Sequence, residues 1–250
     1  MTLQPFEIIN RDGAGPVVII CEHASAHIPA VYDGLGLPPD DLKSHAVWDP
    51  GALDLSLKLS RALDAPVVAS AVSRLVYDCN RPPEAPSAMP AQSELIKVPG
   101  NAGLTAPARQ RRTEAVYHPF CRAVSDVLDK RGPETIVVTV HSFTPVYFGK
   151  PRPVELGLLH DEDSRLADLM LDHAGKLPNR TIARNEPYGP ADGVTHSLKL
   201  HAISRGLANV MIEVRNDLLA TEGMAAGMAL DILALLIPAV NELKKKDMAV

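Results

Sequence analysis

Short apolar runs alternate along the chain with longer segments whose apolar residues recur at helical spacing. The apolar runs are bounded by glycine, proline or polar residues and predict strands at 17–21, 67–72, 75–77, 135–140, 154–159, 181–183 and 208–214. The helical spacing predicts helices at 49–64, 108–130, 161–175, 195–205 and 223–246. This alternation favours βαβ units, in which a largely parallel sheet is covered by helices on both faces.

The segment from Arg81 to Pro107 interrupts the alternation. It contains six prolines and two glycines, which disfavour a regular helix or strand. Long ordered loops in compact domains are commonly functional, so we expect residues 82–107 to form a lid over a site. No other shift in composition marks a boundary, and we expect residues 1–250 to form a single domain.

Chemically capable side chains follow three of the predicted strands. They are Glu22 and His23 after the first strand, His141 after the strand at 135–140, and Glu213 and Arg215 at the close of the last strand. In open α/β sheets, ligands bind outside the carboxyl ends of the strands. We therefore expect these side chains to meet at one edge of the sheet and to form a site.

His23, His141 and a carboxylate have the composition of many catalytic zinc centres. Glu22 is one candidate for the carboxylate, but it joins His23 only if the strand ends between them, because consecutive strand residues point to opposite faces. Asp49 is the other candidate, and it could equally be the N-cap of the next helix. Glu213 is then available as a general base. The sequence has no H-E-x-x-H and no C-x-x-C motif, so an interpretation of these side chains as caps and hydrogen-bonded polar groups stays open.

A polar segment that contains Arg74, Asp78, Asn80 and Arg81 surrounds the predicted strand at 75–77. Arginine is suited to bidentate recognition of carboxylates, so these arginines, together with Arg215, could bind an anionic substrate. The alternative is structural ion pairing, such as Arg74 with Asp78.

Other candidate side chains have weaker support. Ser25 and Ser142 follow strands, but neither lies in a G-x-S-x-G motif, and Cys21 lies inside an apolar run. His45 lies four residues before Asp49 and could orient a ligand. His201 lies on a predicted helix near the site, where packing is as good an explanation as function.

Composition and charge limit the classes of binding partner that we expect for this chain. The formal net charge is −5 and only ten residues are aromatic, which argues against a basic, base-stacking nucleic-acid binder. Three widely spaced cysteines disfavour a disulfide framework and suggest a reducing cytoplasm. The first thirteen residues lack the order of a signal peptide, and an aspartate and a proline interrupt the apolar stretch at 228–240. We therefore expect a cytoplasmic protein with neither a nucleic-acid nor a membrane partner.

Six short motifs, in order along the chain, resemble the N-formylglutamate amidohydrolase family. They are Cys21-Glu-His-Ala-Ser25 followed by Ile28-Pro29, His45-x-x-Trp-Asp49-x-Gly51-Ala52, Ser73-Arg74-Leu-Val-x-Asp78-x-Asn80-Arg81, His141-Ser142-Phe143, Asn185-Glu-Pro-Tyr188 and Glu213-Val-Arg215-Asn-Asp-Leu218. They extend from about residue 16 to residue 220, so the resemblance covers most of the chain. Together the six motifs are far more specific than any one of them.

The resemblance implies a three-layer α/β/α sandwich with a mostly parallel or mixed central sheet, similar to zinc carboxypeptidases. It also implies hydrolysis of N-formyl-L-glutamate to L-glutamate and formate, at the end of a histidine-degradation route. From it we expect one Zn²⁺, or another divalent metal, held by His23, Asp49 and His141, with Glu22 in reserve for Asp49.

The same resemblance assigns roles to the remaining polar side chains. Glu213 would be the general base and later the proton donor, while Arg74, Asn80, Arg81 and Arg215 would hold the carboxylates of a small anionic N-acyl amino acid or polarise its carbonyl. Local arginines would steer an anion against the net negative charge.

Two alternatives stay open beside this hypothesis. The Glu-His-Ala-Ser start differs from the Pro-His-x-Gly start of other members and suggests a branch with a different substrate. The chain could thus hydrolyse another N-acyl amino acid or a small peptide on the same metal site, or could bind a small anion without catalysis. The oligomeric state is left open between a monomer and a small homo-oligomer.

Overall fold

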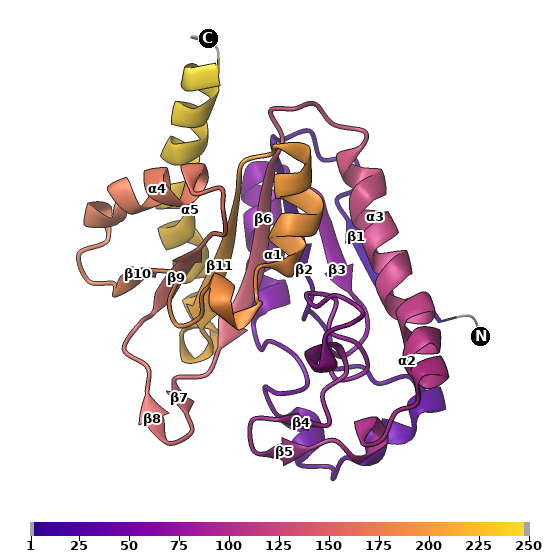
Figure 1. Cartoon of the computed structure of the whole chain (residues 1–250). Helices are drawn as coiled ribbons and strands as arrows, with labels where there is room; N and C mark the ends of the chain where they lie inside the picture. The colour runs from indigo at the N-terminus through magenta and orange to yellow at the C-terminus, as the bar shows by residue number, and fades with distance from the viewer. Residues whose placement is uncertain (1–2, 248–250) are drawn as a thin grey trace.

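A seven-stranded mixed sheet forms the centre of the structure, a computed structural model that describes residues 3–247 (Figure 1). Its strands are β1 (Phe6–Ile9), β2 (Val17–Cys21), β3 (Val67–Ser70), β6 (Ile136–Phe143), β9 (Leu156–Leu159), β10 (Ile182–Arg184) and β11 (Asn209–Arg215), in the spatial order β1-β3-β2-β6-β11-β9-β10. The four central strands β3, β2, β6 and β11 are parallel, whereas β1 and β9 run antiparallel to β3 and β11. The expected mostly parallel or mixed sheet is confirmed.

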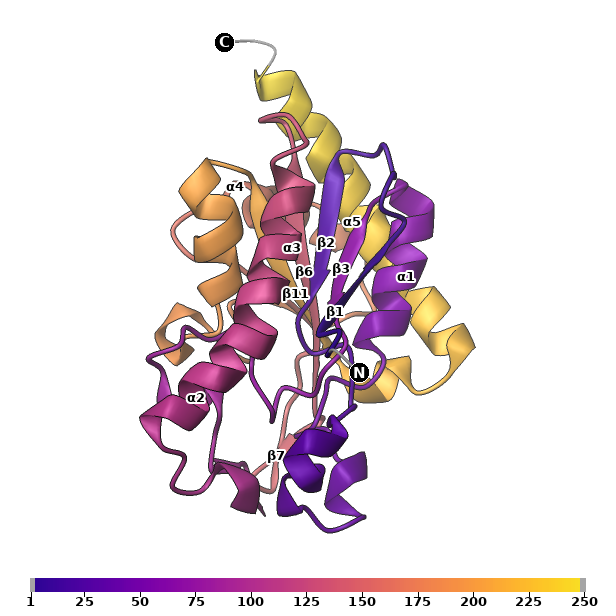
Figure 2. The same ribbon diagram turned by 90° about the vertical axis from the view of Figure 1, so that its right-hand side faces the viewer.

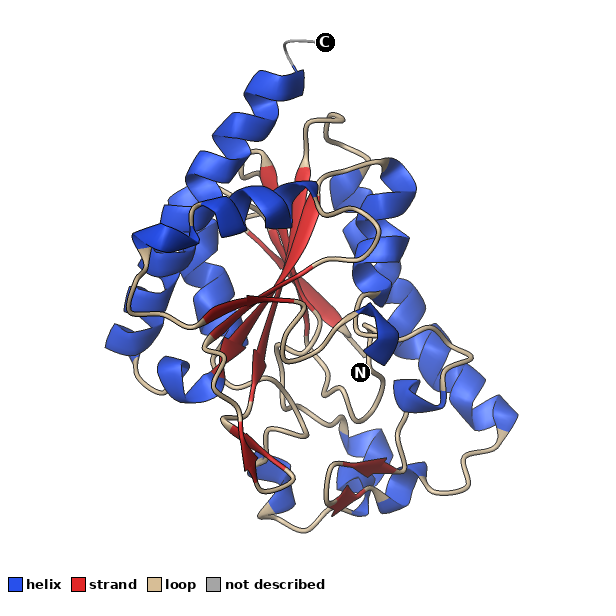
Figure 3. Ribbon diagram, turned by 60° about the vertical axis from the view of Figure 1, so that its left-hand side comes forward, coloured by secondary structure: helices blue, strands red, loops and turns tan. Residues whose placement is uncertain are grey.

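Helices cover both faces of this sheet (Figures 2 and 3). The first layer contains α1 (Ala52–Leu63), α4 (Arg165–Asp172) and α5 (Glu222–Asp247), and the second contains α2 (Ala106–Arg112) and α3 (His118–Leu128). Alternate side chains of the fully buried strand β2 point to the two helical layers. Val17 and Ile19 pack with the first layer, and Val18 and Ile20 pack with the second. The three-layer α/β/α architecture is therefore confirmed.

The helix expected at 108–130 is a continuous helical run with a π turn inside it. The turn η5 (Thr113–Tyr117) lies between α2 and α3. Pro119 accounts for it, because proline has no N–H to donate to the carbonyl four residues earlier.

One expectation about secondary structure is wrong. Residues 75–77 form a turn and not a strand, since the Ser73 hydroxyl and carbonyl accept hydrogen bonds from the backbone N–H groups of Leu75 and Val76.

The segment expected to be a helix at 195–205 is helical, but most of it is a π turn, η8 (Leu198–Ala202), followed by a 3₁₀ turn, η9 (Ile203–Arg205). Gly206 closes it with a positive φ of 70°, as expected. The edge strand β1 lies in a segment for which the sequence predicts no strand.

Two hairpins lie beyond the carboxyl edge of the sheet (Figures 1 and 3). The first, β4 (Gln92–Ser93) with β5 (Ile96–Lys97), belongs to the proline-rich segment, and the second is β7 (Val146–Tyr147) with β8 (Lys150–Pro151). The remaining short helical turns are η1 (Ala30–Gly36), η2 (Asp41–Lys43), η3 (Pro86–Ala88), η4 (Pro99–Asn101), η6 (Ala174–Lys176), η7 (Pro190–Asp192) and η10 (Asn216–Leu219). The segment at 82–107 thus contains only short elements, as its prolines predict.

From the sequence we expect no stretch that is long and apolar enough to span a membrane, but helix α5 contains one. By length and composition alone, residues Glu222–Lys245 are apolar enough to cross one, and 44% of that stretch is buried inside the protein. Met228, Ile232 and Leu236 of this helix belong to the core of the first layer. A core helix passes the same test, so this property is weak evidence for a membrane span.

Candidate active site

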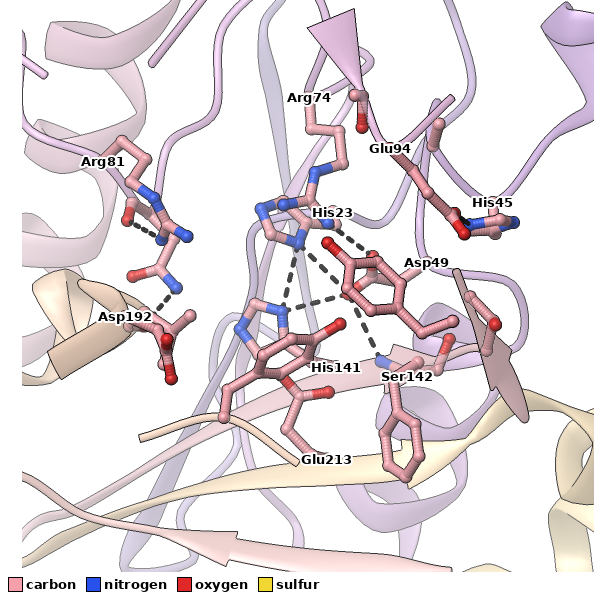
Figure 4. Close-up of a pocket in the computed structure, with 18 residues that line it drawn as sticks. His23, His45, Asp49, Arg74, Arg81, Glu94, His141, Ser142, Asp192 and Glu213 are labelled. Atoms are coloured by element: carbon pink, nitrogen blue, oxygen red, sulfur yellow. Dashed lines mark hydrogen bonds and ion pairs between the residues drawn. The ribbon is translucent and has the colours of Figure 1, made fainter. Parts of the chain in front are cut away.

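A cavity of about 310 Å³ opens at the carboxyl edge of the central strands (Figure 4). His23 follows β2, His141 lies in β6, and Glu213 lies opposite His141 in the parallel register of β11. Asp49 reaches the cavity from the loop before α1, where its backbone N–H donates to the His23 carbonyl at 3.0 Å. The structure therefore brings together residues that the sequence places at the ends of separate strands.

Three donor atoms form a nearly equilateral triangle on the floor of this cavity. His23 Nδ1 and His141 Nδ1 each lie 3.1 Å from Asp49 Oδ2, and the two nitrogens lie 3.1 Å from each other. All three residues are at most 3% exposed. Donors around one tetrahedral ion at about 2.0 Å would lie roughly 3.3 Å apart, so the triangle has the size of a metal site.

The outer nitrogens of both rings face carboxylates. His23 Nε2 lies 2.7 Å from Asp78 Oδ1, and His141 Nε2 lies 3.2 Å from Glu22 Oε2. A proton on each outer nitrogen would satisfy these carboxylates and leave a lone pair on each Nδ1, which are the atoms that face one another. Metal-bound histidines have this arrangement, because a carboxylate behind the ring fixes the tautomer. The residues present therefore fit a divalent cation.

The charge around the triangle also favours a cation. Burial and Arg74 lower the pKa of His23, but Asp78 and Asp49 outweigh them and raise it. Burial opposes ionisation of Asp49, yet His23 and His141 hold the pKa of that carboxyl well below its usual range. With Asp78 also ionised, the floor holds more buried carboxylates than guanidinium groups, and a bound cation would balance this excess.

Of the two candidate carboxylates, Asp49 and Glu22, the structure places only Asp49 in the triangle of donor atoms. Glu22 lies behind His141 and contributes no atom to the triangle, because it extends to the other side of the strand end. Asp49 is not the N-cap of α1, since Gly51 occupies that position and no side chain caps the helix. Asp49 is thus free to face the two histidines.

Glu213 is buried beside the triangle, and its Oε2 has no hydrogen-bond partner among residues 3–247. Burial raises the pKa of this carboxyl to about 7, and Asp49 adds to the effect against His141 and His23. A carboxyl with that pKa can both accept and return a proton near neutral pH. The geometry therefore suits the general-base role expected for Glu213.

Two of the residues expected to bind substrate, Arg74 and Asn80, already form hydrogen bonds with other parts of the protein. Arg74 donates to Asp49 Oδ1 and to Asp78 Oδ2, both at 3.0 Å, and so holds the two carboxylates that flank His23. The Asn80 side chain is bound to the segment after η7, because it donates to the Val194 carbonyl and accepts from the Ser197 N–H. Both residues line the cavity, yet their polar groups are occupied by protein partners.

Arg81 retains donors for a ligand. It lines the cavity, and its one hydrogen bond within residues 3–247 runs from Nη1 to the Asn80 carbonyl at 2.9 Å, which leaves the rest of the guanidinium available. Of the two arginines that line the cavity, Arg74 is paired with carboxylates, whereas Arg81 forms no ion pair with any described residue.

The expectation that Arg215 acts in the site needs correction. Its guanidinium binds Asp217, 2.8 Å away, and lies 3.8 Å from Glu155, and the residue does not line the cavity. These two acidic residues draw the side chain away from the pocket, although the strand register places Arg215 only two residues after Glu213.

The mouth of the cavity is closed on one side by contacts between loops. His45 Nε2 lies 2.7 Å from Glu94 Oε2, and the Phe148 backbone N–H donates to Glu94 Oε1 at 3.4 Å. Glu94 therefore connects the β4–β5 hairpin with the β7–β8 hairpin and with the loop before α1 (Figure 4). His45 belongs to this rim and does not orient a metal-facing residue, contrary to the expectation from its spacing.

Sequence reasoning missed two residues of the cavity region. The sequence suggests Asp78 only as an ion-pair partner of Arg74, and its place behind His23 depends on the turn at 73–78. Tyr188 lines the cavity, and its only sequence signal is its place in the Asn185-Glu-Pro-Tyr188 motif. His201 is buried away from the cavity lining, which favours packing over function.

Comparison with known proteins gives a family and two similar folds. The family model for N-formylglutamate amidohydrolase matches residues 15–220. The crystal structure of a gene product from Agrobacterium tumefaciens has 51% sequence identity and a TM-score of 0.94, with 96% of each chain covered. The crystal structure of N-formylglutamate amidohydrolase from Ralstonia eutropha has 20% identity and a TM-score of 0.70, with 98% of this chain and 100% of that chain covered, and this likeness concerns the fold alone. No curated protein matches this chain.

Proposed function

Because the chain belongs to the N-formylglutamate amidohydrolase family and is a hydrolase, we propose that it cleaves N-formyl-L-glutamate into L-glutamate and formate with the help of a divalent cation. His23, Asp49 and His141 would hold the cation, and two imidazoles with one carboxylate favour Zn²⁺. The observation that carries the proposal is the triangle of three donor atoms beside the unpartnered carboxylate of Glu213.

The chemistry divides between the cation and Glu213. A divalent cation in the triangle would polarise the formyl carbonyl and make water more acidic. Glu213 accepts a proton from water as the water oxygen bonds to the formyl carbon, and it then returns this proton to the amide nitrogen as the C–N bond breaks. This releases formic acid and the amine of L-glutamate. The formic acid proton then passes to the amine, so the products are formate and L-glutamate with a protonated amine, and atoms and protons balance.

The positive groups of the cavity would select an anionic substrate. Arg81 would bind a substrate carboxylate through its free guanidinium donors. Arg74 has a different task, since it keeps Asp49 and Asp78 in place on either side of His23. Arg215 has no part in this proposal because Asp217 and Glu155 occupy it.

Two further properties belong to the same proposal. We place the reaction in the cytoplasm, in histidine degradation, and the three unpaired cysteines support a reducing compartment. We also treat residues 1–250 as one catalytic domain, because the floor of the cavity combines residues from position 23 to position 213. A monomer or a small homo-oligomer would serve this purpose, with no nucleic acid or membrane as partner.

The direct experiment is a formate-release assay with N-formyl-L-glutamate on protein of known metal content. Turnover that depends on a stoichiometric divalent metal is the expected result. Calorimetry on the same sample distinguishes an enzyme from a small-anion binder, because a binder would retain the substrate unhydrolysed. Binding without formate release would contradict the proposed function.

A second substrate class is favoured by the apolar mouth of the cavity. Leu95 and Phe148 at the tips of the two hairpins are 74% and 53% exposed, and Tyr147 beside them lines the cavity. An N-acyl amino acid with a larger side chain, or a small peptide, could rest on these residues. A panel of N-formyl amino acids and formylated dipeptides, compared by kcat/KM, ranks this alternative against N-formyl-L-glutamate.

A further inference from the structure

The segment Asn185–Tyr188 is fixed firmly against β9 and brings a tyrosine to the cavity. The Asn185 side chain accepts a hydrogen bond from the His160 backbone N–H at 2.9 Å, and the Asn185 backbone N–H donates to the Leu158 carbonyl at 3.2 Å. Asn185 has a positive φ of 49°, and a Cβ at Gly157 would collide with the carbonyl of Glu186. The backbone is thus built for a close approach to β9, and Tyr188, at its end, lines the cavity.

Most side-chain donors that line the cavity are occupied by protein acceptors. These donors are Arg74 to Asp49 and Asp78, Asn80 to the Val194 carbonyl, Ser142 to the Pro50 carbonyl, and Thr144 to the Val146 carbonyl. The Tyr188 hydroxyl, by contrast, has no hydrogen-bond acceptor among residues 3–247, because the Arg152 guanidinium next to it can only donate. An unused donor in a site whose other donors are satisfied is available to a ligand.

Arg152 holds the Tyr188 ring in place. Its guanidinium lies 4.8 Å from the centroid of the Tyr188 ring and 4.2 Å from that of Tyr147, so it is stacked between the two tyrosines at the mouth. Tyr188 also packs against the small apolar cluster that contains Leu159 and Met211. Arg152 and this cluster together constrain the ring, as a positioned functional group requires.

Tyr188 and Glu213 line the same cavity. Burial and the Glu213 carboxylate raise the pKa of Tyr188, against the opposing effect of Arg152. The phenol is therefore neutral at physiological pH and acts as a hydrogen-bond donor. A neutral donor beside the general base differs from an arginine, which would pair with the Glu213 carboxylate and weaken it as a base.

We propose that Tyr188 is a catalytic residue whose hydroxyl donates a hydrogen bond to the acyl oxygen as negative charge develops on that atom. The phenol keeps its proton throughout, and proton transfer remains with Glu213. Because Tyr188 shares the cavity with the general base Glu213, we assign it to the reacting carbonyl and leave the carboxylate of the substrate to Arg81. This proposal rests on the proposed amide hydrolysis.

Tyr188→Phe tests the proposal because it removes the hydroxyl and leaves the ring, its packing and its cation–π contact with Arg152. We expect kcat to fall about 100-fold while KM changes less than about threefold, since the hydrogen bond strengthens only in the transition state. The metal content and the melting temperature should stay at the wild-type values. Tyr32→Phe is the matched control: this tyrosine also stacks on an arginine, Arg112, but it does not line the cavity, and both constants should stay within about threefold.

The outcomes separate this inference from the proposed function. An active wild type with an unchanged kcat in Tyr188→Phe overturns the role of Tyr188 and leaves the proposed function in place. An effect confined to KM also overturns it, because the hydroxyl would then bind the ground state and the transition state equally. A wild type that hydrolyses no member of the N-formyl panel overturns both.

Discussion

The floor of the cavity and its rim differ in burial and in how their polar groups are partnered. His23, Asp49 and His141 on the floor are at most 3% exposed, and a carboxylate or a guanidinium supports each of them from behind. On the rim, the His45 side chain is 38% exposed and is paired with Glu94, which lies on the turn of a hairpin with two residues in each strand. Residues held from several sides suit chemistry that needs fixed distances, whereas a rim of short hairpins can vary with the substrate.

The largest effect should come from the floor. We expect His141→Ala to lower the metal content to near zero and to reduce formate release at least about 1,000-fold, because one of three donors is lost. Metal analysis and a formate assay on the same sample check this, with circular dichroism to verify the fold. His45→Ala is the matched control on the rim and should change turnover only a few-fold. Near-normal activity of His141→Ala would remove this histidine from the site.

Glu213→Gln should lower kcat about 100- to 10,000-fold without changing the metal content, since Glu213 lies beside the triangle and is not part of it. Wild-type kcat/KM should also fall as the pH drops below about 7. Burial raises the pKa of Glu213 from 4.5 to about 7, and the protonated carboxyl cannot accept a proton. A pH profile from 5 to 9 checks the second expectation, and a profile that is flat between pH 6 and 8 would contradict it.

Arg81→Ala should have an intermediate effect that depends on the substrate. We expect KM for N-formyl-L-glutamate to rise about tenfold, and KM for a neutral N-formyl amino acid to rise less, because a charge-assisted hydrogen bond to a carboxylate is lost. Arg215→Ala is the control that separates the structure from the sequence hypothesis, and it should leave both KM values unchanged. Equal effects of Arg81→Ala on the two substrates would argue against carboxylate recognition.

The smallest effect is expected at the rim. Glu94→Gln removes the charge that pairs with His45 but keeps an acceptor for the Phe148 N–H. The exposed ion pair contributes little, so we expect the melting temperature to change by only a degree or two and KM by less than about threefold. A loss of turnover as large as that of His141→Ala would show that the rim takes part in the chemistry and would end the distinction between the two regions.

The difference between the floor and the rim of the cavity also explains which parts of the fold and of the site could be predicted from the sequence. His23, His141 and Glu213 follow or end apolar strands, and parallel strands have to bring such ends to one edge of the sheet. The central parallel strands and the helical layers were predictable for the same reason. The sequence could not show that Asp49 faces the two histidines and that Glu22 lies behind His141, because this depends on which way the two side chains turn, before α1 and at the end of β2.

Residues that enter the site from turns were harder to predict. Asp78 reaches His23 only because residues 73–78 fold into a turn closed by Ser73, where apolar residues suggested a strand. Arg215 has the spacing of a site residue, but two acidic neighbours, Asp217 and Glu155, hold it outside the cavity. Side-chain pairing of this kind depends on contacts distant in sequence, which periodicity does not reveal.

The most direct test of metal-dependent hydrolysis is a titration of metal-depleted protein. The protein is stripped with a chelator, its fold is verified by circular dichroism, and Zn²⁺ is added back while formate release from N-formyl-L-glutamate is measured. We predict that the stripped protein is inactive and that activity returns in proportion to Zn²⁺ until one equivalent per chain is bound at His23, Asp49 and His141. Full activity of the folded, metal-free protein would contradict the account.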